Sequence, residues 1–409
     1  MLGTILPVRS LLGAIFMLMA GSGFLATLIS LQLEAGGTTS LLIGLVATSY
    51  FVGLTVGSLC VSALIQRIGH IRAFATFVSL FSASTLAYAV HQDAALWAAL
   101  RFIDGFCMAG VFVCLESWLN ERAEPETRGS VLASYMIALY AGQAIGQFLL
   151  NLSHDKPSMP FMAASILLSL AVIPVAVTRI SGPAFEPRPP LTMRRLYGVS
   201  PLGIVGAAIT GLMLGAFYAL GAVYVRRLGL DIAAAAIFMS SVILGGVILQ
   251  WPIGRLSDRF DRRRVIVGTF AATVAVSVGI ALFGAPGGLL LFLGGIFGGL
   301  TFALYPLCVA HTNDHLSREE RVSASGGLVL AYSAGAAVGP VAGALAMMML
   351  GPAGLYAFIA TCALGAFGFA LWRQRIGVPV PNVLQQPYQI LPRTTPMSAS
   401  LDPRAAEEV

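Results

Sequence analysis

The chain has 409 residues, of which 57% are hydrophobic and only 10% are charged, and its mean hydropathy is +0.85. So little polar surface cannot coat a water-soluble globule, which excludes an ordinary soluble protein and points to lipid as the solvent. The formal net charge is +6, but the positions of the basic residues, described below, argue against a nucleic-acid partner.

Twelve apolar runs, bounded by charged or turn residues, are long enough to cross a bilayer. A hydrocarbon core of roughly 30 Å needs about 20 apolar residues of helix. In chain order the runs lie at about 10–33, 41–64, 73–90, 95–118, 129–151, 158–178, 201–225, 233–253, 265–284, 287–311, 323–349 and 352–372. The sequence therefore predicts an all-α integral membrane protein with twelve transmembrane helices.

The basic residues predict how these helices are oriented. With both termini inside, only Lys156, Arg226 and Arg227 fall in outer loops, and only Arg101 falls within a span. All the other Lys and Arg residues lie in inner segments, as the positive-inside rule requires. We therefore expect a multi-pass membrane protein with both termini in the cytoplasm.

A repeat divides the chain into two halves. Four residues of the first half recur in the same order about 193 residues later: Asn120 as Asn313, Arg128 as Arg321, Gly142 as Gly335 and Gly146 as Gly339. We predict two pseudo-symmetric six-helix bundles at 1–180 and 201–375. A proline-rich cytoplasmic linker at 181–200 would join them, and a polar, proline-rich tail at 376–409 is expected to be disordered.

The charge is concentrated in the segment GRLSDRFDRRR at 254–264, and SALIQRIGHIR at 62–72 is a weaker copy of it. Both resemble the signature G-x-L-x-D-R-x-G-R-R of the major facilitator superfamily, although Ser62 and Gln66 replace the Gly and Asp in the first copy. The resemblance implies loops that latch one bundle against the other, whereas solvated positive-inside anchors are the alternative. The predicted gating residues are Arg67, Gly69, Arg72, Gly254, Asp258, Arg259, Arg262 and Arg263. Whether Glu116 or Glu121 pairs with Arg67 or Arg72 is left open.

A second family element, R-x-x-x-G, appears in RFIDGFCMAG at 101–110. Arg101 and Asp104 are three residues apart and share one helical face inside the membrane, where charge is costly. The functional interpretation is that Asp104 takes and releases a proton while Arg101 binds substrate or tunes that acid; Glu34 is a second candidate for the proton. The alternative is an ion pair that merely fixes this helix.

Glycines are spaced for close helix packing in two of the predicted spans. GQAIGQFL at 142–149 resembles the family's antiporter signature G-x-x-x-G-P, but Gln147 stands where Pro would be. This departure makes drug efflux the less favoured function. We interpret the glycines as positions where two helices approach closely. They are Gly142, Gly146, Gly335, Gly339 and Gly343.

Polar and aromatic residues in mid-span are candidates to line a substrate path. Gln143 and Gln147 share a face with Tyr140, and a buried glutamine needs hydrogen-bond partners that a wet cavity provides. The predicted substrate-binding residues are Arg101, Tyr140, Gln143, Gln147, Gln250, Trp251 and Tyr305. One intramembrane arginine and few acids suggest a neutral or anionic solute with a ring, such as a vitamin, aromatic metabolite or sugar.

The superfamily resemblance implies a secondary active transporter of the bacterial inner membrane that works by alternating access. Proton coupling and uptake are expected, efflux by proton antiport is the alternative, and a transporter-like sensor or assembly protein is a further one. The segment ESWLNERAEPETRGS at 116–130 resembles a YcaD-like group of bacterial permeases. No catalytic motif, metal-ligand cluster or cofactor is indicated. The expected partners are a small-molecule substrate, protons and the lipid bilayer, and the superfamily default is a monomer.

Overall fold

The computed structural model describes residues 8–123, 127–154, 156–177, 191–284, 286–376, 380–381, 385–395 and 401–402. The first half contains α2 (Arg9–Ser22), α3 (Leu25–Ala35), α4 (Ser40–Ile68), α5 (His70–Val90), α6 (Ala94–Arg122), α7 (Arg128–Gly146), the 3-10 helix η2 (Gln147–His154) and α8 (Met159–Val177). The second half contains α9 (Met193–Val199), α10 (Pro201–Arg227), α11 (Ile232–Arg259), α12 (Arg262–Phe283), α13 (Gly288–Asn313), α14 (Arg318–Leu350) and α15 (Gly354–Ile376).

The described residues contain 11 helices that are long and apolar enough to cross a membrane, with α2 and α3 together forming the first. The remaining predicted span, at about 129–151, corresponds to α7 and η2. Side-chain caps begin several of the helices, because the carboxylates of Asp93 and Asp231 accept the backbone N–H groups of Leu96 and Ala234. The predicted fold class, an all-α integral membrane protein, is confirmed.

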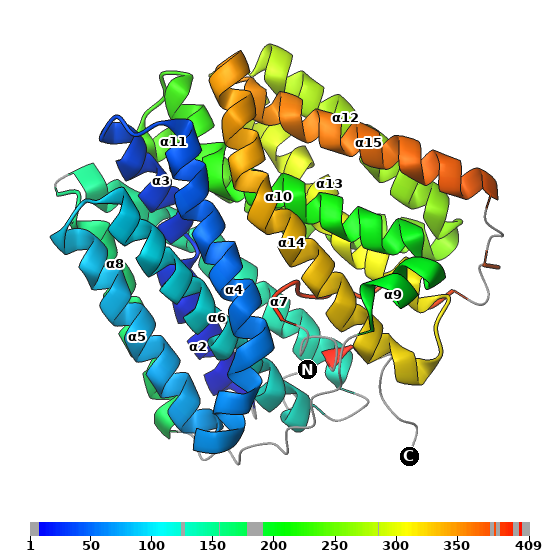
Figure 1. Ribbon diagram of the computed structural model, residues 1–409, viewed down its shortest axis with the longest axis horizontal. Coiled ribbons are helices and arrows are strands. Elements are labelled where there is room, and N and C mark those ends of the chain that lie inside the picture. Colours follow the sequence, from blue (N-terminus) through cyan, green and yellow to red (C-terminus); the bar gives the residue numbers. More distant parts are fainter. Residues whose placement is uncertain are drawn as a thin grey trace.

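The same helix pairs recur in both halves, which gives the molecule its pseudo-symmetry. In the first half α4 packs on α6, α5 on α8 and α2 on α7. In the second half α11 packs on α13, α12 on α15 and α10 on α14. Figure 1 shows the two bundles side by side, with the blue and cyan helices of the first beside the green to orange helices of the second.

The predicted close packing at the glycines is confirmed. A Cβ added to Gly146 on α7 would lie 2.5 Å from the backbone oxygen of Ala20 on α2. A Cβ on Gly335 of α14 would lie 2.0 Å from the backbone oxygen of Ala208 on α10. Real Cβ atoms cannot approach so closely, so these glycines let equivalent helix pairs make backbone contact in the two halves.

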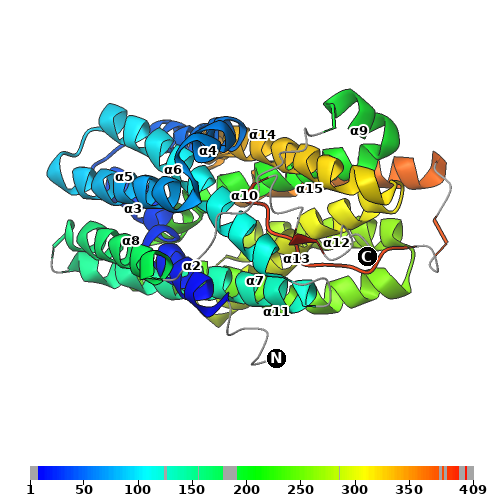
Figure 2. The same cartoon turned by 90° about the horizontal axis from the view of Figure 1, so that it is seen from below.

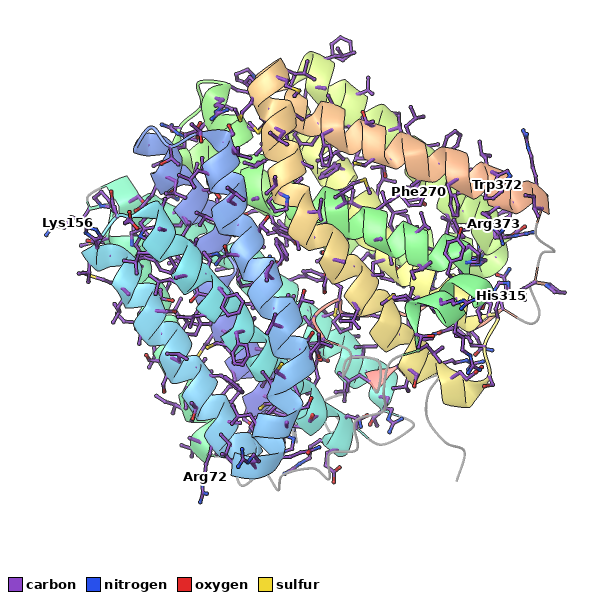
Figure 3. The ribbon with its side chains drawn as sticks, in the orientation of Figure 1. Arg72, Lys156, Phe270, His315, Trp372 and Arg373 are labelled. Atoms are coloured by element: carbon purple, nitrogen blue, oxygen red, sulfur yellow. The ribbon has the colours of Figure 1, made fainter. Side chains whose placement is uncertain are left out.

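The bundles touch at one end and diverge toward the other. We call the end that carries Glu34 and Arg227 the outer end, and the end that carries the loops before α5 and α12 the inner end. Toward the outer end, Thr48 on α4 donates to the carbonyl of Ala337 on α14 at 2.7 Å. In Figure 3, Arg72 and Arg373 mark the inner ends of the two bundles, which lie far apart.

The C-terminal segment differs from the predicted disordered tail at its described residues. Residues 385–395 run into the space between the bundles, where the side chains of Leu391 and Thr395 are buried. Figure 2 shows this segment as a red trace between the two halves. The predicted linker at 181–200 lies outside the described residues up to 190, and its remainder contains the short helix α9.

Candidate functional site

A cavity of about 160 Å³ lies between the bundles. Helices α2 to α7 of the first half form one wall, and α10 and α14 of the second half form the other. Its polar and aromatic lining consists mainly of Ser22, Tyr50, Arg101, Tyr140, Gln143, Tyr218 and Tyr332, and the C-terminal residues Pro392, Arg393 and Thr394 also line it. The site is thus rich in tyrosine and is partly built by the tail.

Three of the predicted substrate-binding residues, Arg101, Tyr140 and Gln143, line this cavity. The guanidinium of Arg101 lies 4.2 Å from the ring centroid of Tyr50, a cation–π contact between α6 and α4. The ring of Tyr140 lies 5.4 Å from that of Phe302 across the two bundles. These side chains can stack on a flat solute and donate hydrogen bonds to it.

Asp104 lies behind Arg101, sealed between α5 and α6 with no solvent exposure. Its Oδ2 accepts a hydrogen bond of 2.6 Å from the Tyr88 hydroxyl, and its Oδ1 accepts one from the hydroxyl of Ser84. The nearest Arg101 nitrogen is 3.8 Å from Oδ2. Arg101, which lines the cavity, thus lies between this acid and the cavity.

Gln147 lies outside the cavity. It has no solvent exposure, and its Nε2 donates to the backbone oxygen of Gly23 at 3.2 Å. Gly23 separates α2 from α3. Gln147 therefore satisfies a backbone group at the break in the first span, a structural contact that its spacing from Gln143 did not reveal.

The other three predicted substrate-binding residues also lie away from the cavity. Gln250 on α11 is buried, and neither polar atom of its side chain has a hydrogen-bond partner among the described residues. Trp251 is 57% exposed on the outside of the bundle, where the Arg255 guanidinium lies 3.7 Å from its ring. Tyr305 is buried behind Tyr332, with 5.5 Å between the ring centroids.

Glu34, the second candidate for the proton, forms an ion pair between the bundles. Nε of Arg227 on α10 lies 2.7 Å from Oε1 of Glu34 on α3. The two residues are 193 positions apart, the spacing of the internal repeat. The two residues therefore lie near corresponding ends of the first helix of each half, and their ion pair joins the bundles at the outer end, an arrangement suited to a latch.

The second copy of the signature loop forms a network at the inner end. Arg262 is almost fully buried and donates to Asp314 at 2.5 Å, to Ser257 at 2.9 Å and to Asp258 at 3.3 Å. Burial raises the pKa of the Asp314 carboxyl, and the Arg262 guanidinium opposes that shift. Arg263 pairs with Asp261 at 3.1 Å. These charges thus bind one another within the second bundle.

The same network reaches the C-terminal segment. Asp258 accepts the backbone N–H of Tyr388 at 2.7 Å, and Gly254 leaves room for the ring of that tyrosine. Arg262 donates to the backbone oxygen of Gln386 at 2.6 Å. Arg259 is exposed on the surface. The predicted gating loop is therefore joined to the tail.

The first copy of the loop is more open. Gly69 turns the chain between α4 and α5 with φ of 84°, a conformation that favours glycine. The side chains of Arg67 and Arg72 are exposed. Over the part of the chain that the structure describes, neither forms an ion pair with Glu116 or Glu121, because Glu116 points into the protein and accepts the Tyr135 hydroxyl at 2.9 Å.

Sequence reasoning missed several residues of the site. Glu116 was considered only as a loop partner, although an acid within an apolar span is itself a signal of function. Tyr218 and Tyr332 belong to the mid-span polar and aromatic residues that the sequence offers as candidates, but, like Tyr50 and the neighbouring Phe302, they carry no local pattern that separates them from core aromatics. The cavity position of Arg393 could not be found from a proline-rich tail.

Comparison with known proteins agrees with this architecture. The sequence profile of the Major Facilitator Superfamily matches residues 11–304 and, in a second alignment, 203–397. The MFS-type transporter YcaD of Salmonella enteritidis is 30% identical over 388 residues, which cover 92% of this chain and 97% of the relative.

Two solved structures share the fold at low sequence identity. The nucleoside transporter NupG is 14% identical with a TM-score of 0.74, over 90% of this chain and 98% of its own. A bacterial homologue of the human lysosomal transporter Spinster, in an inward-facing and occupied conformation, is 13% identical with a TM-score of 0.73, over 90% and 96%. Together with the two pseudo-symmetric bundles around a central cavity, the matches establish that this chain belongs to the major facilitator superfamily of membrane transporters.

Proposed function

We propose that the protein is a secondary active transporter that moves a small organic solute through the central cavity by alternating access, with uptake coupled to protons. The observation that carries this proposal is the central cavity, which is lined from both halves and has the Glu34–Arg227 pair joining the bundles at the outer end. Rocking of the bundles about this cavity would expose it to each side in turn.

Tyr140, Gln143 and Arg101 are proposed to hold the solute. Tyrosine rings offer flat stacking surfaces, while the amide and guanidinium donate hydrogen bonds that fix orientation. The fold is shared with a nucleoside transporter, so nucleosides join vitamins, aromatic acids and sugars as solutes to test. The orientation proposed is that of the positive-inside rule, with the signature loops and the tail in the cytoplasm of a bacterial cell.

Asp104 is proposed as the proton carrier. When it is ionised, it attracts the Arg101 guanidinium across 3.8 Å. Protonation of Asp104 removes that attraction, and the Arg101 guanidinium is then free to bind the solute in the cavity. Proton uptake would thereby couple to solute binding through one side chain.

The test is solute-driven proton movement in proteoliposomes, with the panel above and the variant Asp104→Asn. Asp93→Asn is the matched control, because Asp93 is an exposed N-cap of the same helix and Asn caps as well as Asp. We expect Asp104→Asn to abolish proton movement while solute counterflow persists, and Asp93→Asn to behave as the parent. Solute flux without proton movement in the parent protein would overturn the coupling, and the absence of flux for every solute would overturn transport of this panel.

A further inference from the structure

The C-terminal segment 385–395 is attached to the second bundle by specific hydrogen bonds. The backbone N–H of Gln386 donates to Asp314 at 2.8 Å, and that of Tyr388 donates to Asp258 at 2.7 Å. Arg262 donates to the backbone oxygen of Gln386 at 2.6 Å. Charged groups of the signature loop, together with Asp314 at the end of α13, therefore satisfy the backbone of this segment, which fixes the direction in which the chain enters the space between the bundles.

The segment places the guanidinium of Arg393 among aromatic rings of the second bundle. Its central carbon lies 4.4 Å from the ring centroid of Phe302 and 5.6 Å from that of Tyr332, and Nη2 lies 3.5 Å from the Tyr218 hydroxyl. We call Tyr218, Phe302 and Tyr332 the aromatic cage. Aromatic faces attract a desolvated cation, and this is the means by which proteins recognise organic cations.

The next two residues reach the opposite wall. The hydroxyls of Thr394 and Thr395 both donate to the carboxylate of Glu116 on α6, which has no solvent exposure. Glu116, a buried acid on a membrane-spanning helix, thus contacts the two residues that follow Arg393 in the tail. The segment bridges the two bundles, so the inner ends cannot close on the cavity while it is in place.

The charges of the cavity favour a cationic ligand. The sequence suggested a neutral or anionic solute because of Arg101, but while Asp104 is ionised its carboxylate balances the charge of Arg101, and the ring of Tyr50 covers the guanidinium face. The second bundle supplies the aromatic cage, which already holds a guanidinium, and α6 of the first bundle supplies the carboxylate of Glu116. A soluble organic cation would find in the aromatic cage the same rings and hydroxyl that Arg393 contacts, with the carboxylate of Glu116 beyond them on α6.

We propose that the aromatic cage is a binding site for a soluble organic cation of the guanidinium or amidinium type, and that Arg393 occupies it as a tethered competitor. The proposal rests on the proposed function only in naming the class of solute that the cavity takes. Tethering gives the arginine an effective concentration in the millimolar range. A soluble cation can bind only those molecules whose cage is not filled by Arg393. The tail therefore raises the apparent Kd, which equals the intrinsic Kd divided by the fraction of molecules with an empty cage.

The first test measures amide hydrogen exchange of the full-length protein with and without benzamidinium. We expect the amides of Gln386 and Tyr388 to be protected in the ligand-free protein, because both donate to carboxylates. Saturating benzamidinium should speed their exchange about tenfold or more as the tail is displaced. The neutral analogue benzamide should leave their exchange unchanged. Unprotected amides in the ligand-free protein, or protection that persists with the cation bound, would refute the competition.

The second test compares benzamidinium affinity in full-length variants by calorimetry. Arg393→Ala empties the cage and should lower the Kd about tenfold or more, whereas Arg375→Ala, at an exposed arginine near the end of α15, should leave it unchanged. Adding Phe302→Leu to Arg393→Ala should weaken binding about tenfold, since a cation–π contact is lost. Equal affinity in the parent and Arg393→Ala would show that the arginine does not compete.

The outcomes separate this inference from the transport proposal. If Arg393→Ala binds benzamidinium more tightly but no solute flux is seen in proteoliposomes, the cation site is supported and transport of the tested solutes is refuted. Flux of a neutral solute that benzamidinium fails to inhibit in Arg393→Ala would retain transport and overturn the cage as part of the solute site.

Discussion

Neutralising Glu34 should release the outer end of the bundles. In Glu34→Gln the Arg227 guanidinium loses a carboxylate oxygen at 2.7 Å, and both side chains are partly buried, with 19% and 28% exposed. At this separation two unit charges attract by about 6 kcal/mol at an effective dielectric constant of 20. Desolvation and side-chain ordering cancel most of that, so about 2 kcal/mol remains. The ratio of outer-open to outer-closed molecules should therefore rise roughly 30-fold.

The shift can be measured as a distance between spin labels on Ala35→Cys and Leu289→Cys, at exposed positions at the outer ends of the two bundles, with Cys60 and Cys362 replaced. We expect a longer-distance population to grow in Glu34→Gln. The charge swap Glu34→Arg with Arg227→Glu should return the distribution toward that of the parent.

Arg226→Gln is the matched control, because Arg226 donates to the backbone oxygen of Leu230 and not to Glu34. It should leave the distances unchanged. The reasoning would be refuted if Glu34→Gln had the same distance distribution as the parent, or if the charge swap were as open as the single variant.

Three further variants test packing, the inner network and the limits of the site. Gly335→Ala should lower the free energy of unfolding by about 1–3 kcal/mol because its Cβ meets backbone, whereas Gly268→Ala, with nothing within 4 Å, should raise it by up to about 1 kcal/mol; thermal unfolding followed by intrinsic fluorescence compares them, and equal shifts would contradict the close packing. Arg262→Ala should destabilise by about 3–5 kcal/mol because it leaves a buried carboxylate unpaired, while Arg264→Ala at an exposed position should change little in the same assay. Trp251→Ala should bind the transported solute with an affinity within about twofold of the parent protein. A roughly tenfold loss of affinity would show that Trp251 belongs to the binding site after all.

Local features of the sequence were sufficient to predict the helices and their arrangement in two bundles. Apolar runs of bilayer length predict the helices because the hydrocarbon core leaves backbone groups no other partners. The paired glycines predicted contacts that recur at Gly146 and Gly339, since only a residue without Cβ permits such an approach. The excess of Lys and Arg in one set of loops predicts the orientation of the helices, because cytoplasmic loops of multi-pass proteins carry that excess.

The site depended on information that is not local. Gln143 and Gln147 share a helical face, but α7 ends between them at Gly146, so one reaches the cavity and the other binds the break between α2 and α3. Trp251 and Tyr305 are mid-span aromatics like Tyr140, and only the rotation of each helix within its bundle decided which of them faces the cavity. That rotation is set by packing against neighbouring helices.

The tail shows the same division most clearly. The sequence alone determined that the tail, rich in proline and polar residues, cannot build a hydrophobic core of its own. The two bundles together supply what it lacks, with Asp258 and Asp314 for its backbone, aromatic rings for Arg393 and a buried carboxylate for its threonines. Since those partners come from helices distant in the chain, only the tertiary structure decided that the tail lies in the cavity.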